Sequence, residues 1–443
     1  MSPFKNVDKA KVSFYASVLA GVFAYGVAVG TYEIFPFEQI HFAKRSLFQV
    51  FDEREMLTKT KPTKHIFTAR YEGNGVVTHD AEGMAPGLTL ITGFFDGALE
   101  VRLIDPSGAV VNRWPVRAGE IWDNLDHIPP ELRPTTSWNA AMNGAVLLPD
   151  GSVVFNHFGL VKLDRCGEVL WLVRRVTHHS VEPARDGGFW VGAKRYIRGR
   201  SKHPPIEPPY EEDTILHISA GGTIVEEFSI LDLLIKNGLR AVLFSNNRTF
   251  DPNPEFDVIH LNDVDELTVA DAVGFPQFDV GDLLVSIRQP NMVLVFDPDT
   301  EVIKWYQVGP WIQQHDADFH ADGRITVFDN NYDRTEDGSV FGGSRIIAVD
   351  PASGATEVMY GGVDDQPMYS RTQGDHQLLG NGNILMAEAE AGRVLEVDSR
   401  GRVVWEFINR YSDDEVLRIS DAIRYDRDYF STDGWACSGG VSE

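Results

Sequence analysis

The sequence predicts an all-β fold, a six-bladed β-propeller, preceded by one N-terminal transmembrane helix. Three observations lead to this prediction: a strand motif that recurs six times, glycine-containing turns between those strands, and one uncharged stretch near the N-terminus. A unit of four short strands cannot bury both faces of its own sheet, so several units must stack and close into a ring. The 443 residues and 43% hydrophobic content fit a folded protein in which one closed domain takes up most of the chain.

The strand motif is clearest in two copies. Residues 144–173 read GAVLLPDGSVVFNHFGLVKLDRCGEVLWLV, and residues 376–407 read HQLLGNGNILMAEAEAGRVLEVDSRGRVVWEF. Both contain an Asp-Gly or Asn-Gly turn, then an alternating strand, then the pattern Asp-x-x-Gly-x-Val-x-Trp. Four looser copies complete the set, and the proline-rich residues 203–213 interrupt one of them. We expect the aromatic residue that ends each unit to pack between neighbouring blades.

The chain is expected to divide into five segments. They are a cytoplasmic tail (1–11), a transmembrane anchor (12–32), a linker (33–69), the propeller (70–430) and a C-terminal tail (431–443). The anchor segment contains no charged residue and is about as long as a bilayer core is thick. Lys5, Lys9 and Lys11 precede it, which favours an N-terminus inside the cell and a propeller in the periplasm. A cleaved signal peptide is the alternative.

Charge and cysteine content exclude several classes of function. The net charge of -25 argues against a nucleic-acid partner, because binding phosphates requires a basic surface. Cys166 and Cys437 are too few for a metal cage, and we expect them to be unpaired. No metal and no cofactor are predicted.

Leu231–Asn237 has the spacing of a short helix that ends at Gly238, in an insertion that we interpret as a lid.

Several polar residues should meet at the centre of the propeller, because the innermost strand of each unit lines the central channel. His179 and His315 each stand eight residues before a turn glycine, and His260 and Arg288 belong to the fourth unit. A ring of blades has no structural need for several imidazoles and a guanidinium at its centre. Such a set suits an anionic ligand, since arginine offers a two-pronged donor and imidazole adds N–H groups. A histidine there could also act as a nucleophile or carry a proton.

Three segments of this chain resemble the bacterial arylsulfate sulfotransferases. They are DVIHLNDVDEL…GDLLVSIRQ within residues 257–289, QQHDADFHADGRITVFDNN at residues 313–331, and the terminal copy of the strand motif. The resemblance covers roughly residues 70 to 410. It implies a six-bladed propeller that moves a sulfuryl group from a phenolic sulfate ester to another phenol, without a nucleotide sulfate donor. In this family a histidine is transiently sulfated.

The resemblance also implies roles for individual residues. His315 looks like the sulfated nucleophile, His260 and Arg288 look like sulfate binders, and His179 looks like a third. Independently of the resemblance, a general acid must protonate the departing phenolate, and this role is open to His260 or His179. The implied catalytic residues are His315, His260 and Arg288, and the implied substrate-binding residues are His179, Asn262 and Gln289. The charge of Asp316, next to the nucleophile, is expected to raise the pKa of His315.

The expected partners are a small aromatic sulfate ester, a phenol and a membrane, with no nucleic acid; self-association is left open. The alternative function is a non-catalytic, membrane-anchored propeller that binds a protein partner or an anionic ligand. A quinone-dependent dehydrogenase fits less well, because the chain has six repeats instead of eight and no adjacent cysteines.

Overall fold

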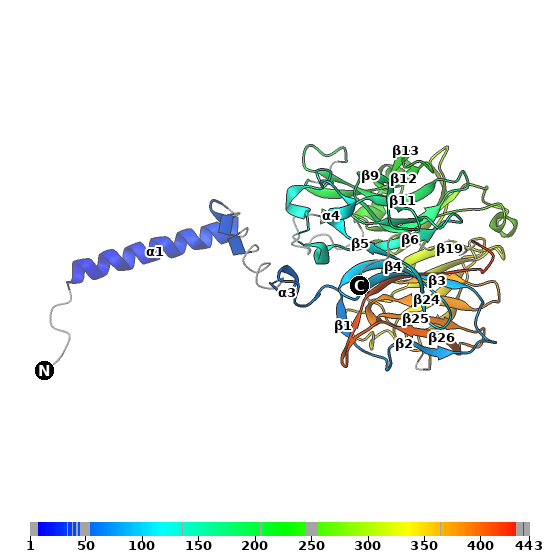
Figure 1. The fold of residues 1–443 in the computed structure, drawn as a ribbon. Helices are drawn as coiled ribbons and strands as arrows, with labels where there is room; N and C mark the ends of the chain where they lie inside the picture. The colour runs from blue at the N-terminus through cyan, green and yellow to red at the C-terminus, as the bar shows by residue number, and fades with distance from the viewer. Residues whose placement is uncertain are drawn as a thin grey trace. The chain divides into compact units, whose positions relative to one another are not determined.

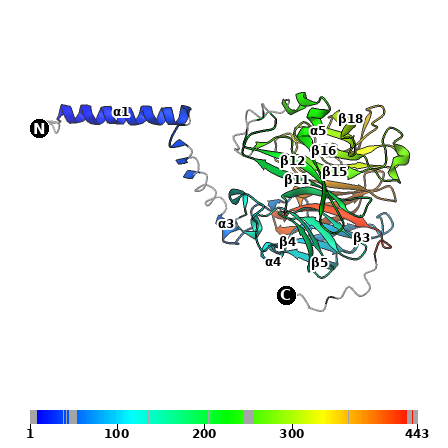
Figure 2. The ribbon, with the colours of Figure 1, turned by 90° about the horizontal axis from the view of Figure 1, so that it is seen from above.

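The computed structural model of the protein divides into two compact units, Met1–Thr63 and Lys64–Glu443 (Figures 1 and 2). It describes residues 8–32, 34–37, 39–40, 43–44, 54–134, 136–203, 206, 208–244, 256–363, 365–430 and 437.

The first unit contains helix α1 (Lys9–Tyr32) and the short helix α3 (Arg54–Leu57). Helix α1 has 24 residues and a mean hydropathy of 1.8, and it is the one helix among the described residues that is long and apolar enough to cross a membrane. Apolar side chains such as Phe14, Leu19 and Phe23 are exposed along it, as expected of a helix that meets lipid. A signal sequence would have the same length and composition.

The second unit is built from sheets that follow one another along the chain, here called sheets 1 to 6. Sheet 1 contains β29 (Ile419–Tyr425), β3 (Leu88–Phe95), β4 (Ala98–Ile104) and β5 (Val110–Val116). Sheet 2 contains β6 (Asn143–Leu147), β7 (Val153–Asn156), β8 (Leu160–Leu163) and β9 (Val169–Val173). Sheet 3 contains β10 (Thr177–Pro183), β11 (Phe189–Ile197), β12 (Tyr210–Ile218), β13 (Ile224–Ser229) and, parallel to β12, β14 (Phe256–Asp257).

The other three sheets repeat this antiparallel order. Sheet 4 contains β15 (Leu261–Glu266), β16 (Leu283–Ile287), β17 (Met292–Asp297) and β18 (Val302–Val308). Sheet 5 contains β19 (His315–Phe319), β20 (Ile325–Asp329), β21 (Arg345–Val349) and β22 (Thr356–Gly361). Sheet 6 contains β23 (Asp375–Leu378), β24 (Ile384–Glu388), β25 (Arg393–Val397), β26 (Val403–Ile408) and an added strand, β2 (Gly75–His79). A small sheet outside these six contains β1 (Ile66–Thr68), β28 (Glu415–Leu417) and β27 (Arg410–Ser412).

The first strands of the six sheets form a closed circle. Strands β29, β6, β10, β15, β19 and β23 each contact the next, and β23 contacts β29 again. The predicted all-β, propeller-like fold with one N-terminal apolar helix is therefore confirmed. The sequence analysis missed that sheet 1 takes its inner strand from the C-terminal end of the chain, where Ile419 pairs with Gly93. This pairing joins the two ends of the domain and leaves fewer free sheet edges.

Side chains on the inner strands connect each sheet to the next. At the junction of β10 and β15, the Ser180 hydroxyl accepts the backbone N–H of Val264 at 3.3 Å. At other junctions a carboxylate accepts the N–H, and the pairs are Asp263–Ala317 (2.9 Å), Asp316–His376 (2.6 Å), Asp375–Ala422 (3.2 Å) and Asp421–Ala145 (2.9 Å). The inner strands therefore run in the same direction around the channel.

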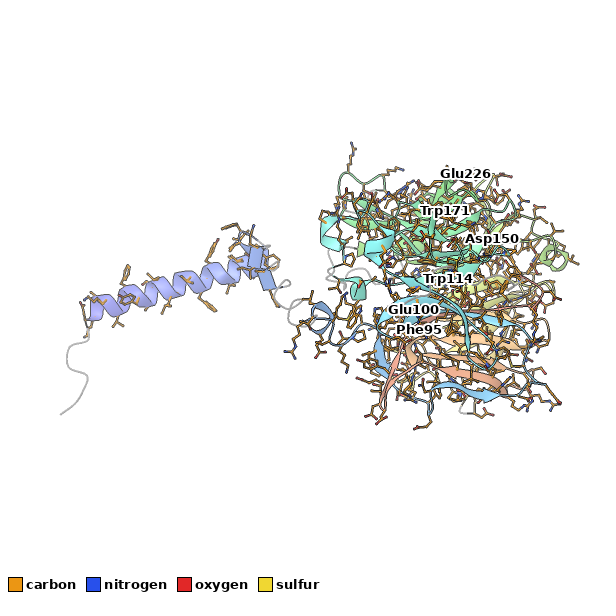
Figure 3. All side chains as sticks on the ribbon, in the orientation of Figure 1. Phe95, Glu100, Trp114, Asp150, Trp171 and Glu226 are labelled. Carbon is orange, nitrogen blue, oxygen red and sulfur yellow. A yellow bond between two sulfur atoms is a disulfide. The ribbon has the colours of Figure 1, made fainter. Side chains whose placement is uncertain are left out.

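The aromatic residues that end the strand motif pack between sheets, as predicted. The indole of Trp114 donates to the Asp164 carbonyl of the next sheet at 2.9 Å, and Trp171 donates to Ala220 at 3.1 Å (Figure 3). Trp405 makes the same bond to the Pro106 carbonyl at 2.8 Å. The motif thus encodes contacts between sheets as well as turns within them.

Short helices complete the second unit: α4 (Ala118–Ile121), α5 (Ile230–Lys236) and the 3₁₀ helices Pro130–Leu132, Ser137–Asn139, Arg240–Phe244, Asp271–Gly274 and Ala389–Ala391. Helix α5 matches the predicted helix within one residue, and the Ser229 side chain caps its start by accepting the Asp232 N–H at 3.2 Å. Its apolar side chains are buried in the core of sheets 3 and 4, so α5 is not a free lid. Residues 245–255 of the predicted lid lie outside the described residues.

The expectation of unpaired cysteines is wrong. Cys166 and Cys437 form a disulfide with their Cα atoms 5.7 Å apart. The bond joins the β8–β9 turn of sheet 2 to the segment that follows β29. The sequence separation of 271 between the two cysteines explains why no local pattern indicated the pair.

Candidate active site

The structure brings three of the predicted histidines together at one end of the inner strands. His179 lies in β10, His260 directly precedes β15, and His315 begins β19. The ring centroid of His179 is 5.1 Å from that of His260 and 5.7 Å from that of His315. Arg288 lies in the turn between β16 and β17, beside this group.

Irregular backbone turns these side chains toward the channel. The strand registers shift between His178 and Val181 and between His315 and Ala317, which marks a β-bulge in each inner strand. His179 has a φ of 60°, an unfavourable conformation for a residue with a Cβ atom. Bulges commonly re-aim a side chain next to an active site. On the adjacent strand Gly144 is required, because a Cβ atom there would lie 2.4 Å from the His179 carbonyl oxygen.

A single amide fixes the protonation of the His315 ring. Nδ1 of His315 lies 2.7 Å from Oδ1 of Asn330. The amide group of Asn330 donates to the carbonyls of Ser370 at 2.9 Å and Gln373 at 2.6 Å, which leaves its oxygen facing the imidazole. An amide oxygen can only accept, so Nδ1 carries the proton and Nε2 keeps its lone pair. The backbone N–H of Gln373 approaches that nitrogen at 3.3 Å.

The electrostatic environment keeps His315 neutral. Burial, with the positive charge of Arg288 next in importance, lowers the pKa of His315 to about 3. The expectation that Asp316 would raise this pKa is wrong. The Asp316 carboxylate instead bonds to the backbone N–H of His376 at 2.6 Å and to its Nδ1. At neutral pH the imidazole of His315 is therefore uncharged.

Arg288 offers unused hydrogen-bond donors beside His315. Its Nη2 donates to Oε1 of Gln313 at 2.8 Å, while its buried Nε has no hydrogen-bond partner within the described residues. Burial lowers the pKa of Arg288, and the nearby Asp257 opposes that effect. The guanidinium nevertheless stays charged at any working pH. A buried cation with free N–H groups is suited to an anionic ligand.

His178 and His179 are joined by a hydrogen bond, and His178 approaches a carboxylate. Nδ1 of His178 lies 2.7 Å from Nδ1 of His179, and Nε2 of His178 lies 3.2 Å from Oδ1 of Asp213. The second approach lacks hydrogen-bond geometry within the described residues, so the Nδ1–Nδ1 bond alone links the two rings, and one ring donates while the other accepts. Burial, with His178 next in importance, holds the pKa of His179 well below its usual range. His179 is therefore neutral at neutral pH.

His260 pairs with a carboxylate of its own. Its Nδ1 makes a hydrogen bond to Oδ2 of Asp257, and its backbone N–H donates to Asp213 at 3.1 Å. Burial alone would raise the pKa of Asp257, but the bond from His260 holds that pKa well below its usual value. A carboxylate in this position stabilises a protonated imidazole and orients its other nitrogen.

The two remaining candidates occupy different positions. Asn262 lines the central cavity, and its side-chain N–H group donates to the carbonyl of Gln314. Its Oδ1 is buried without a partner in the described part of the chain. Gln289 is half-buried in the β16–β17 turn, where its backbone N–H donates to Ile259 at 3.0 Å. Gln289 does not line the cavity.

All six inner strands line this central cavity, which has a volume of about 70 Å³. Imidazoles and amides occupy one end, and carboxylates follow one or two residues later on the same strands. The lining carboxylates are Glu182, Asp263, Asp316, Asp375 and Asp421. Burial, with Asp316 next in importance, raises the pKa of Asp263 to about 7, and burial raises the pKa of Asp265 to about 8. Part of this group is thus protonated near neutral pH.

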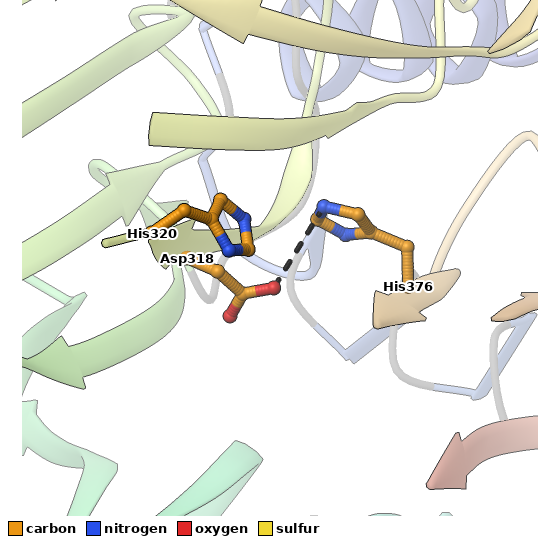
Figure 4. Close-up of side chains that lie close together, drawn as sticks. All are labelled: Asp318, His320 and His376. Atoms are coloured by element: carbon orange, nitrogen blue, oxygen red, sulfur yellow. Dashed lines mark ion pairs between the residues drawn. The ribbon is translucent and has the colours of Figure 1, made fainter. Parts of the chain in front are cut away.

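Two groups of side chains in the described residues have the composition of a metal site: Asp318, His320 and His376, and His203, Glu212 and Asp232. In the first, Asp318 Oδ2 lies 3.7 Å from Nε2 of His376 (Figure 4). Nε2 of His320 and Nε2 of His376 each lie 2.6 Å from the Thr326 hydroxyl. That hydroxyl can donate to one ring and accept from the other. The cluster therefore forms a hydrogen-bonded network without needing an ion.

The profile of the arylsulfotransferase (ASST) family matches residues 144–410, more than half of the chain. The protein belongs to this family. All the predicted site residues of this arylsulfotransferase fall within the matched region. The aryl sulfotransfer activity typical of the family agrees with a site that combines a neutral histidine with a buried arginine. A search of curated proteins found no match.

Solved structures with a similar fold are distant from this arylsulfotransferase. A protein of unknown function from Bacteroides caccae is 13% identical, covers 76% of this chain and 98% of its own, and has a TM-score of 0.48. The virginiamycin B lyase from Staphylococcus aureus is 11% identical, covers 61% and 70%, and has a TM-score of 0.35. A streptogramin B lyase is 12% identical, covers 79% and 90%, and has a TM-score of 0.38. These scores support no functional argument.

Sequence reasoning missed the residues that hold the histidines in place. Asn330 lies within the Phe-Asp-Asn segment of the resemblance, but that pattern did not indicate which ring it would orient. Asp213 and Asp257 lie in or beside the proline-rich and insertion segments, where no repeat position marks them. The signal that could have found them is the general need of a functional imidazole for an orienting acceptor.

Proposed function

We propose that this arylsulfotransferase transfers a sulfuryl group from an aryl sulfate ester to a phenolic acceptor through a sulfohistidine at His315. One observation carries the proposal: Asn330 fixes the proton of His315 on Nδ1, so Nε2 carries the lone pair beside the unused donors of Arg288. The backbone N–H of Gln373 donates to this lone pair at 3.3 Å, and an incoming substrate displaces that contact. A nucleophile, a positive charge and a nearby proton carrier are what sulfuryl transfer requires.

In the first half-reaction the Nε2 lone pair of His315 attacks the sulfur atom of the ester. The N–S bond forms as the S–O bond to the aryl group breaks. The departing phenolate takes a proton from Nε2 of His260, whose protonated form the Asp257 carboxylate stabilises. Arg288 donates to the non-bridging oxygens, where negative charge builds up.

In the second half-reaction the acceptor phenol gives its proton to the now neutral His260. Its oxygen attacks the sulfur, the new S–O bond forms and the N–S bond breaks, which returns the electron pair to His315. Protons therefore balance over the cycle. We keep His179 as a substrate-binding residue, because its ring centroid lies 5.7 Å from that of His315.

The deciding experiment exposes the purified protein to a chromogenic aryl sulfate without an acceptor and stops the reaction by rapid quench. We expect one equivalent of phenol and a peptide, the one that contains His315, heavier by one sulfuryl group. His315→Ala should form neither product, while His320→Ala, on the same segment, should form both. A wild-type protein that releases no phenol and carries no adduct would refute the proposal.

We also assign helix α1 as a membrane anchor that holds the second unit in the periplasm. The length and composition of α1 support this, and so does the Cys166–Cys437 disulfide, because such bonds persist in oxidising compartments. Protease added to spheroplasts should digest the second unit and leave cytoplasmic proteins intact. Protection of the second unit until the membrane is lysed would contradict the assignment.

A further inference from the structure

Arg418 is a second arginine near the active site without a counter-ion. It lies between β28 and β29, and its guanidinium is largely buried. Within the described residues its Nε has no hydrogen-bond partner, and the group makes no ion pair. The guanidinium lies over the ring of Phe67, 4.8 Å from its centroid. Burying an unpaired charge is costly, so a protein keeps one where a ligand supplies the opposite charge.

The nearest carboxylate is already engaged elsewhere. Glu390 accepts hydrogen bonds from Arg371 at 2.7 Å and from the Thr372 hydroxyl at 3.0 Å. Burial lowers the pKa of Arg418, while Glu390 opposes this effect and the positive charge of Arg371 adds to it. The positive charge of Arg418 is thus only partly compensated by the protein.

Arg418 lines a small cavity that adjoins the central one. This second cavity is small, with a volume of about 10 Å³ that holds about one water-sized group. Its wall includes Phe94 and His65, whose rings stack at 4.5 Å. Burial lowers the pKa of His65 to about 4, so its ring adds no positive charge at neutral pH. Three residues line both cavities, and they are Asn143, Gln373 and Ser420. The backbone N–H of Gln373 is also the group that approaches Nε2 of His315 at 3.3 Å.

We propose that Arg418 binds a carboxylate on the aryl group of the substrate, with one carboxylate oxygen placed in this small cavity. This inference rests on the proposed function, because it places the aryl group next to His315. A substrate with such a substituent brings the missing counter-ion into the cavity and can engage the planar guanidinium through two parallel hydrogen bonds. A neutral substituent of the same shape leaves the buried charge unpaired, so the site discriminates by charge.

The test compares acceptors that differ only in charge. With one common aryl sulfate donor, kcat/KM is measured for 3- and 4-hydroxybenzoate and for the two matching hydroxybenzamides. Wild type should prefer one carboxylate isomer to its amide. In Arg418→Gln that preference should fall roughly 10- to 100-fold, the usual range for a hydrogen bond to a charged group. Arg418→Lys should keep part of it, and Arg402→Gln should keep all of it, because Arg402 is an exposed arginine already paired with Asp80 and Asp398.

Two results would overturn the inference: no carboxylate preference in wild type for either isomer, or an equal preference in wild type and Arg418→Gln. The wild-type comparison decides even if Arg418→Gln does not fold. Calorimetric binding of the same four compounds separates this inference from the proposed function. If no acceptor is sulfated but the carboxylate binds more tightly than its amide in an Arg418-dependent way, the anion site stands and the transferase mechanism fails.

Discussion

The two ends of the central channel use the same strands for opposite purposes. On β19, His315 faces the cavity at the first position, and Asp316, at the next, bonds to the following inner strand. On β15 the amide of Asn262 precedes the carboxylate of Asp263 in the same way. The residues proposed for catalysis therefore stand at the strand starts, where bulges interrupt the sheet, and the carboxylates that join the inner strands stand one residue further along.

Burial acts at both ends but in opposite directions. It lowers the pKa of His315 to about 3 and raises the pKa of Asp265 to about 8, because a low-dielectric environment disfavours whichever form is charged. Arg288 is the exception, since a guanidinium cannot shed its proton to escape the cost. The end that contains His315 and Arg288, proposed for catalysis, thus keeps a fixed positive charge. The end that contains the carboxylates changes its charge with pH.

The largest effect should come from removing that fixed charge. Arg288→Gln should lower kcat roughly 10²- to 10³-fold, the usual consequence of losing one donor to a developing negative charge. Arg288→Lys, which keeps the charge but loses the planar fork, should fall between wild type and Arg288→Gln. Steady-state transfer assays measure both variants. A kcat for Arg288→Gln within threefold of wild type would show that the fixed positive charge of Arg288 does not contribute to sulfuryl transfer.

The next largest effect concerns the proton of His315. In Asn330→Asp a carboxylate faces Nδ1, stabilises the imidazolium and raises the pKa of His315. Because only the neutral ring attacks, the acid limb of the pH–rate profile should move up by roughly 1 to 2 pH units from its wild-type position. Asn331→Asp is the matched control: Asn331 also donates to two carbonyls, those of Phe341 and Gly343, but does not touch His315. An equal shift in both variants would refute a positioning role for Asn330.

The sequence predicted the sheets better than the site because of where the determining contacts lie. The segment Asp164–Trp171 contains its own turn and its own contact with the next sheet, so its recurrence was enough to indicate the repeated sheets. Closure by β29 and the disulfide each join segments that are far apart in the chain and leave no local pattern. The position of His315 followed from the repeat and the resemblance, whereas its low pKa depends on burial and on Arg288.

A smaller effect should appear in the stability of the carboxylate end. Asp265 has a folded-state pKa of about 8, above an unfolded value of about 4. Its stabilising contribution is therefore complete below about pH 4 and is lost as the pH rises through 8. Asp265→Asn keeps an oxygen to accept the Phe319 N–H, which Asp265 accepts at 3.0 Å. The variant should match wild type near pH 4.5 and be about 1–3 kcal/mol more stable near pH 8.5.

Thermal unfolding at both pH values measures this difference, with the exposed Asp299→Asn as the control. Transfer activity of Asp265→Asn should stay within about threefold of wild type, because the Asp265 carboxylate bonds to the backbone of Phe319 and has no assigned role in the proposed mechanism. Destabilisation of the variant by the same amount at both pH values would mean that Asp265 is ionised at both. The carboxylate end would then not change its charge between these pH values.

The smallest effect should come from metal removal. Thr326 already bridges His320 and His376, and Asp316 bonds to the other nitrogen of His376, so the network beside Asp318 is complete without an ion. Dialysis against a strong chelator should leave the unfolding temperature within about 1 °C and the transfer rate unchanged. Elemental analysis of the dialysed and undialysed protein checks for bound metal. The contradicting result is a stoichiometric divalent ion whose removal also lowers the unfolding temperature by several degrees. Such an ion would keep the carboxylates ionised at all pH values. The two ends would then differ only in the sign of their protein charge.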